Sequence, residues 1–159
     1  MVAHSSGPRE VAFVSSLPQA HHLRLESLLF FNRRQDKVRP GIELAIDRYG
    51  PPEIVSDAHG LKVRVAGPVE VQCLFAIEKR GETSRPVGLV LYTRDSFERI
   101  TIMHLVVAED YAAGGPFADQ HLLLRLVQAV RRVARRTSGI RQVEVLYAQS
   151  RPRNVAAVA

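Results

Sequence analysis

The sequence has no tryptophan and only one cysteine, Cys73, among its 159 residues. A single cysteine excludes an internal disulfide, and its place in an alternating apolar run predicts a buried, reduced thiol. Aromatic residues make up only 6% of the chain. The sequence therefore lacks the stacking surface that is typical of proteins that bind single-stranded nucleic acid.

Long apolar runs are absent as well. No stretch approaches the roughly 20 residues that a membrane-spanning helix needs. The N-terminus has neither the basic region nor the apolar segment of a signal peptide. We therefore expect no membrane partner and a cytoplasmic location. The 6 histidines are scattered apart from the adjacent His21 and His22, so the sequence predicts no metal site.

Positive charge is in excess. The net charge is +6, from 22 Lys and Arg against 16 Asp and Glu, and arginine far outnumbers lysine. Such an excess can attract nucleic acid, an acidic protein or a phosphorylated cofactor. The alternative is a codon composition that favours arginine. The length and the 46% of hydrophobic residues predict one domain over residues 1–159, with flexible ends at 1–9 and 149–159.

The first 50 residues have the pattern of a strand followed by two helices. Residues 9–16 have the apolar content of a short strand. Helical spacing of apolar side chains then covers 19–34 and 40–49. A Gly-Pro-Pro sequence at 50–52 stops the second helix, because proline cannot continue it.

Four β segments follow, each short and bounded by polar or glycine-containing loops. They cover residues 61–66, 69–78, 87–93 and 99–107. Consecutive strands with short connections predict an antiparallel meander. The last two segments are apolar on both faces, as expected for central strands.

The stretch from Arg99 to Arg136 organises the chain. Its strand runs into a loop over 108–118, and the longest helical pattern follows over 119–136, with Asp119 as the expected N-cap. The start of such a helix presents free N–H groups and suits an anion, often a phosphate. The alternative is that the glycines and proline at 114–116 only form a tight connection.

A last strand is predicted over 140–148. The long helix before it would return the chain beside the strand that ends at Val107, which gives a parallel pair. We therefore expect an α+β fold with a mostly antiparallel, mixed sheet and helices on both faces.

Three stretches of the chain resemble the GNAT superfamily of N-acetyltransferases. They are Pro86–Val90, Ile102–Val107 and the loop from Glu109 to Gly115 with the helix after it. In that family the glycine-containing loop wraps the pyrophosphate of acetyl-CoA, and the end of the preceding strand offers backbone groups to the pantetheine arm. The resemblance covers roughly residues 10–148, and it implies a GNAT-like domain that transfers an acetyl group to an amine.

The same resemblance implies acetyl-CoA as the co-substrate and locates its binding residues at the strand end and in the loop. These residues are Leu105, Val106, Val107, Tyr111, Ala112, Ala113, Gly114, Gly115 and Phe117.

The loop departs from the family motif at two positions. Ala112 stands where the family has Arg or Gln, and Phe117 stands where the second motif glycine belongs, so a bulky ring could block a phosphate. The family's later helix and final strand pair are also expected to be missing after Tyr147. Either the domain is a trimmed member, or a partner chain completes it, or it no longer catalyses.

Direct acyl transfer needs a base for the amine proton and an acid for the leaving sulfur. A backbone N–H near Leu105–Val107 would polarise the thioester carbonyl. His104 is the candidate base, Glu78 a relay through water, and Tyr147 a weak candidate acid. The structural alternatives are a hydrogen-bonded histidine in the sheet, an exposed strand-end carboxylate and a core tyrosine.

Three functions remain open at this stage. The first is an acetyltransferase that acts on an unidentified small-molecule or protein amine. The second is a GNAT-like binding or regulatory module without turnover. The third, and the least favoured, is association with nucleic acid through Arg131–Arg136, a cluster that also suits the C-terminal end of a helix dipole. An open last strand makes a homodimer a further expectation.

Overall fold

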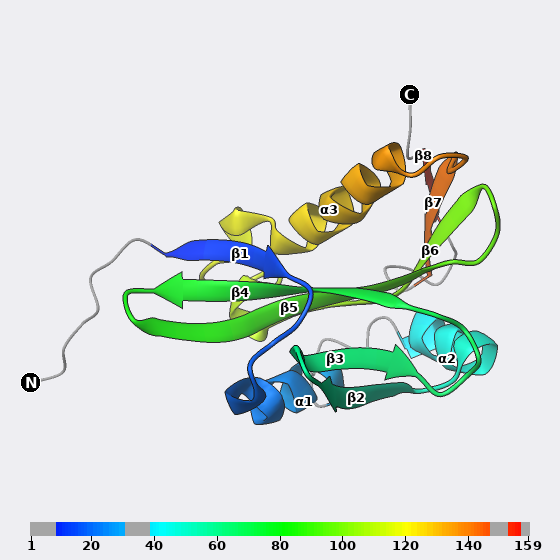
Figure 1. Ribbon diagram of the computed structural model, residues 1–159. Coiled ribbons are helices and arrows are strands. Elements are labelled where there is room, and N and C mark those ends of the chain that lie inside the picture. Colours follow the sequence, from blue (N-terminus) through cyan, green and yellow to red (C-terminus); the bar gives the residue numbers. More distant parts are fainter. Residues whose placement is uncertain (1–8, 31–38, 147–152, 157–159) are drawn as a thin grey trace, which may run out of the picture.

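The computed structural model describes residues 9–30, 39–146 and 153–156. Its fold is α+β, with six strands in one mixed sheet and two more in a separate hairpin. The order in the large sheet is β1-β4-β5-β6-β7-β8. The expected α+β class, the mixed sheet and the helices on both faces are confirmed (Figure 1).

The first four strands of the sheet are antiparallel neighbours. Their bounds are β1 Glu10–Val14, β4 Gln72–Arg80, β5 Thr83–Arg94 and β6 Arg99–Val107. A two-residue turn with Gly81 at φ 61° joins β4 to β5, a conformation that glycine adopts without steric cost. The polar loop expected between the segments 69–78 and 87–93 is therefore mostly strand.

Strand β5 contains a proline although it lies in the middle of the sheet. Pro86 has no N–H for the β ladder, and such residues occur at bulges or edges. The register of β4 with β5 shifts beside it, between Ala76 and Ile77. A second shift, between β5 and β6 at Leu91 and Tyr92, leaves Met103 as an extra residue on β6.

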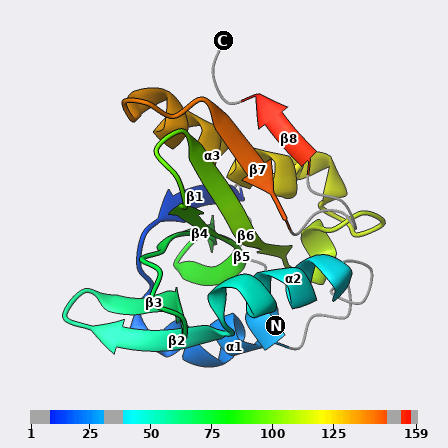
Figure 2. The ribbon, with the colours of Figure 1, turned by 90° about the vertical axis from the view of Figure 1, so that its right-hand side faces the viewer.

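Strand β7 (Gln142–Val145) pairs in parallel with β6, as the sequence predicts. Strand β8 (Arg153–Ala156) then pairs antiparallel with β7, and Figure 2 shows the three strands side by side. The expectation of a flexible segment over 149–159 is thus wrong for 153–156. The strand predicted over 140–148 was expected to be the last strand and an open edge at which a homodimer could form. Both expectations are wrong, because β8 follows β7 and pairs with it.

Helices cover both faces of the sheet. Helix α3 (Leu122–Arg136) lies on one face, and α1 (His22–Phe30) and α2 (Arg39–Tyr49) lie on the other (Figure 1). Each face has its own apolar core. One contains Leu122, Leu126 and Val130 of α3; the other contains residues of α1, α2 and β3.

The predicted four-stranded meander is wrong in one respect. Strand β3 (Gly60–Val65) pairs with β2 (Pro52–Asp57) in a separate hairpin and not with β4. Strand β2 was not predicted, because Pro51 precedes it and Pro52 is its first residue. The meander therefore has three strands, and the hairpin packs beside α1 and α2 below the sheet (Figure 1).

Two helix boundaries also differ from the prediction. The first helical segment begins with a 3-10 turn over Gln19–His21, and α1 then continues to Phe30. Residues 31–34 of the predicted helix lie outside the described residues. Asp119 is not the N-cap of α3, because it lies in a 3-10 turn over Ala118–Gln120. His121, with φ 49°, precedes the helix instead.

Candidate functional site

The loop between β6 and α3 covers residues 108–121 and starts at the buried end of β6. Its first amide, Ala108 N–H, donates to the Val87 carbonyl of β5, which continues the sheet into the loop. A short 3-10 helix, Glu109–Tyr111, follows. The loop thus leaves the sheet at the carboxyl end of β6, where the sequence places the anion-binding turn.

Most of the loop's amides are used within the loop. Gly115 N–H donates to the Ala112 carbonyl at 2.9 Å, Phe117 N–H to the Asp110 carbonyl at 2.8 Å, and Ala118 N–H to the Gly115 carbonyl at 3.2 Å. An anion at these positions would have to displace bonds that already exist.

Gly115 has no space for a side chain. A Cβ there would lie 2.6 Å from the carbonyl oxygens of both Glu109 and Asp110. The glycine is therefore needed so that the loop can close on its own backbone, which is the tight connection of the sequence-based alternative. Ala113 and Gly114 are exposed beside it, and Ala112 is half-buried.

Phe117 packs between two side chains at the inner end of the loop. Its ring centroid lies 5.3 Å from that of Tyr111, and the Arg9 guanidinium carbon lies 3.5 Å above the Phe117 ring. The bulky residue at the second motif position thus has a packing role, as the partner of a buried tyrosine and of a cation.

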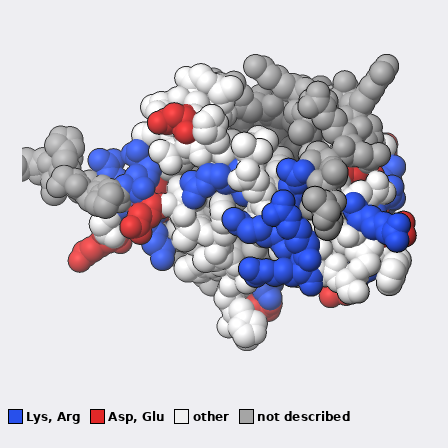
Figure 3. Space-filling view, turned by 90° about the horizontal axis from the view of Figure 1, so that it is seen from above, with Lys and Arg blue, Asp and Glu red and all other residues white. Residues whose placement is uncertain are grey.

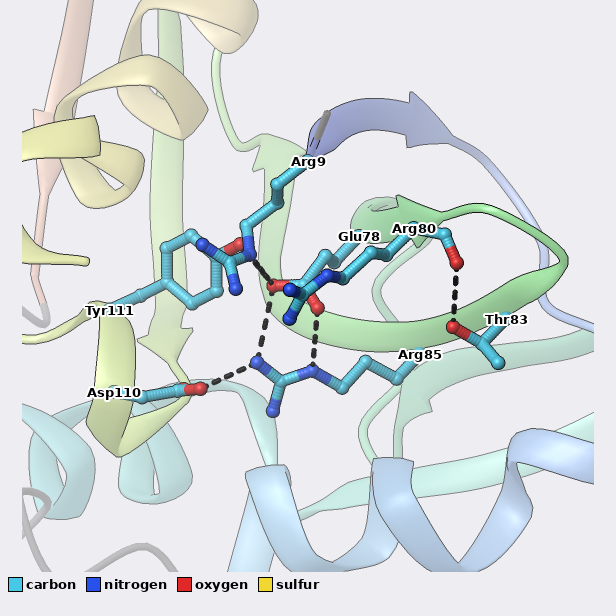
Figure 4. Close-up of polar contacts among 7 residues, drawn as sticks. All are labelled: Arg9, Glu78, Arg80, Thr83, Arg85, Asp110 and Tyr111. Atoms are coloured by element: carbon cyan, nitrogen blue, oxygen red, sulfur yellow. Dashed lines mark hydrogen bonds and ion pairs between the residues drawn. The ribbon is translucent and has the colours of Figure 1, made fainter. Parts of the chain in front are cut away.

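Glu78 is the centre of a polar cluster that the loop shares with the sheet (Figure 4). Its side chain is 8% exposed and accepts two hydrogen bonds from Arg85 at 3.1 and 3.2 Å. Arg9 pairs with it at 3.1 Å, and the Tyr111 hydroxyl donates to it. Arg85 also bonds Asp110 at 2.5 Å. The expectation of an exposed strand-end carboxylate is therefore wrong.

The cluster keeps Glu78 ionised. Burial alone would raise the pKa of its carboxyl group, but the hydrogen bonds from Arg85 and Tyr111 outweigh burial and hold that pKa below its usual value. Burial and the hydrogen bond to Glu78 raise the pKa of Tyr111, which stays protonated as a donor. The hydrogen bonds of the Glu78 cluster thus hold the β6–α3 loop against β4 and β5.

His104 lies elsewhere. It pairs across β5 with Leu91, a residue of the core beneath α1 and α2, so its side chain lies on that face of the sheet. It is 3% exposed, and burial lowers its pKa to about 4. The imidazole is therefore neutral at physiological pH and away from the Glu78 cluster.

The strand-end residues have buried side chains on alternate faces. Leu105 and Val107 belong to the α3 core and Val106 to the opposite core. Only their backbone groups could meet a ligand, as the resemblance implies. Tyr147 lies outside the described residues.

An arginine-lined hollow of about 480 Å³ opens beside the loop. We call it the arginine hollow. Its described lining comes from the start of β1, from α1, from the β4–β5 hairpin and from the loop: Arg9, Arg24, Glu78, Arg80, Thr83, Ser84, Arg85 and Phe117. No local sequence pattern predicts this hollow, because its arginines come from separate segments.

The arginines of α3 form a second basic surface. Arg132, Arg135 and Arg136 are exposed near the end of the helix, and Figure 3 shows Lys and Arg side chains gathered on the face that α3 covers. Cations at the C-terminal end of a helix are stabilised by its dipole. This surface therefore has a structural explanation that requires no partner.

Two further features bear on the kind of site. Within the described ranges, no group of three His, Cys, Asp or Glu side chains could hold a metal ion. No helix in that part of the chain is long and apolar enough to cross a membrane. Cys73 is buried and not in a disulfide, and burial raises the pKa of its thiol, which agrees with the inert thiol that the sequence predicts.

Comparison with known proteins gives no family. No family model and no curated protein matches the chain.

Proposed function

We propose that this chain is a GNAT-like domain that binds acetyl-CoA and transfers its acetyl group to an amine. The observation that carries the proposal is the juxtaposition of the β6–α3 loop and the arginine hollow. Phe117 of the loop lines the hollow together with four arginines, so a phosphate-bearing cofactor that meets the loop also meets positive charge.

The arrangement of the sheet supports the same proposal. Strand β6 ends in the loop, α3 covers one face, and β7 returns parallel to β6. This is the order that the resemblance implies for residues 10–148. In the proposed reaction the amine nitrogen bonds to the thioester carbonyl carbon, the carbon–sulfur bond breaks, and the amine proton is lost as the thiolate leaves.

The described side chains supply little acid–base help. His104 has a pKa of about 4 and is buried, so it is a weak base at neutral pH. Glu78 is ionised, but its carboxylate is already paired with Arg9 and Arg85 and accepts a hydrogen bond from Tyr111. We therefore assign Glu78 a positioning role, in which it holds Tyr111 and the loop against the sheet.

A second candidate is binding of acetyl-CoA without turnover. The buried His104, whose pKa of about 4 makes it a weak base, favours it. Such a domain would sense or sequester acetyl-CoA by binding it, and it would need no general base because no amine is acetylated.

Transfer is tested by following the release of the CoA thiol from acetyl-CoA in the presence of a panel of amines. We expect release that saturates with acetyl-CoA and depends on the amine. The Gly115→Val variant should lose it, because the added side chain clashes with two carbonyl oxygens. Ala58→Val, which adds a side chain at an exposed position in the β2–β3 turn, is the matched control. Binding of acetyl-CoA with no release for any amine would overturn transfer in favour of the second candidate.

A further inference from the structure

We propose that arginine side chains of the arginine hollow bind the phosphate groups of acetyl-CoA, in place of the loop amides. The inference rests on the proposed function and deepens it, because it names the groups that recognise the anionic end of the cofactor. The key residues are Arg24 of α1 and Arg80 at the end of β4.

The first argument is that several backbone donors of the loop are already in use. Three amides of its glycine turn already donate to carbonyl oxygens within the loop, at 2.8 to 3.2 Å. Ala112 adds no charge where a basic side chain could neutralise a phosphate. Side chains outside the turn can therefore supply charge and hydrogen bonds that these residues do not.

The second argument is the charge of the hollow. Its described lining has four guanidinium groups and one carboxylate, Glu78. Glu78 is shared by Arg9 and Arg85, which line the inner wall. Arg24 and Arg80 add two further cations, and Arg24 is exposed to solvent. The lining thus has an excess of positive charge that an anionic ligand would neutralise.

The third argument is geometry. Figure 4 shows the side chains of Arg9, Arg80 and Arg85, from the start of β1 and from β4 and β5, extending toward the same carboxylate. The exposed hydroxyl-bearing residues Thr83 and Ser84 line the same wall. A volume of about 480 Å³ is within the range of small-molecule sites. Guanidinium groups bind phosphate oxygens in pairs, with charge-assisted hydrogen bonds.

The test is calorimetric titration of wild type, Arg24→Gln and Arg80→Gln with acetyl-CoA and with S-acetyl-pantetheine, which has the thioester but no phosphate. We expect each variant to bind acetyl-CoA roughly tenfold more weakly, the effect of one lost hydrogen bond to a charged group. Binding of S-acetyl-pantetheine should not change. Arg132→Gln, on the exposed face of α3, is the matched control, and thermal unfolding shows whether each variant is folded.

The outcomes separate the two proposals. If wild type binds acetyl-CoA and both folded variants bind it equally well, the arginine hollow is not the phosphate site, while the proposed function stands. If wild type binds no acetyl-CoA, the proposed function fails. A titration with inorganic pyrophosphate then decides whether the hollow binds phosphates: binding that weakens in both variants would indicate a different phosphorylated ligand and overturn the assignment to acetyl-CoA.

Discussion

Glu78 connects more of the molecule than any other side chain of the candidate site. Its partners come from the start of β1, from β5 and from the β6–α3 loop. Removal of such a carboxylate leaves Arg9 and Arg85 facing each other at a partly buried position, which costs more than the loss of an exposed ion pair. The same contacts that stabilise the loop make Glu78 unavailable as a general base.

His104 leads to a prediction about pH. Burial holds its pKa at about 4, against 6.5 for an exposed histidine. Between these two values the unfolded chain binds a proton that the folded chain does not, so stability rises with pH and is lost as pH falls. We expect the free energy of unfolding to drop by about 3 kcal/mol from pH 7 to pH 4 through this residue.

Chemical denaturation at a series of pH values measures this effect. His104→Gln should remove most of the slope between pH 6.5 and pH 4.5, above the range in which Glu78 is protonated. The exposed His59→Gln should leave the slope as in wild type. An equal slope in wild type and His104→Gln would contradict a neutral, buried imidazole.

At the scale of elements, α3 depends on close packing against β5. Gly88 of β5 leaves room for the Leu126 side chain, and a Cβ at Gly88 would lie 3.1 Å from a Leu126 methyl carbon. Leu126 is 0% exposed. We expect Leu126→Ala to lower the free energy of unfolding by about 2 to 5 kcal/mol, the usual cost of a cavity in a core.

Urea denaturation of Leu126→Ala and Leu123→Ala checks this packing. Leu123, on the same helix, is 43% exposed, so its truncation should cost about 0.5 kcal/mol or less. Similar losses in the two variants would mean that α3 does not pack on the sheet by the face described.

Strands and helices with a clear apolar period could be predicted from the sequence. The segments at β3, β4, α2 and α3 have such a period, and the structure has a strand or a helix at each. Strand β2 was not predicted because Pro51 and Pro52 are typical of a loop, although Asp57 at its end and Gly60 at the start of β3 are typical turn residues. Strand β8 was not predicted because the Arg-Pro-Arg sequence at 151–153 is typical of a tail, and β8 begins only at Arg153.

The site was harder to predict than the strands. The sequence indicated the loop and Gly115, since a glycine between a strand and a helix is a local signal. It could not indicate that Glu78 is buried, because Arg9, Arg85 and Tyr111 reach it from positions far apart in the chain. The arginine hollow could not be predicted for the same reason. Arg24 and Arg80 line one hollow only because the chain folds α1 against the β4–β5 hairpin.

At the scale of the whole molecule, the candidate groups gather at one end of the sheet. The β4–β5 hairpin, the start of β1 and the β6–α3 loop meet there. The opposite end carries a separate cluster of Asp95, Arg99 and Thr101, which joins the β5–β6 turn to β6. The two apolar cores pack on either face of the sheet that carries these groups.

Acetyl-CoA binding at this end of the sheet can be measured by calorimetric titration of the purified full chain with acetyl-CoA and, separately, with CoA. We expect saturable binding of both in the micromolar range, because both carry the phosphates that we propose the arginines bind. No heat at millimolar ligand, with the protein shown to be folded, would rule out acetyl-CoA as the ligand, and the basic surfaces would then need other partners.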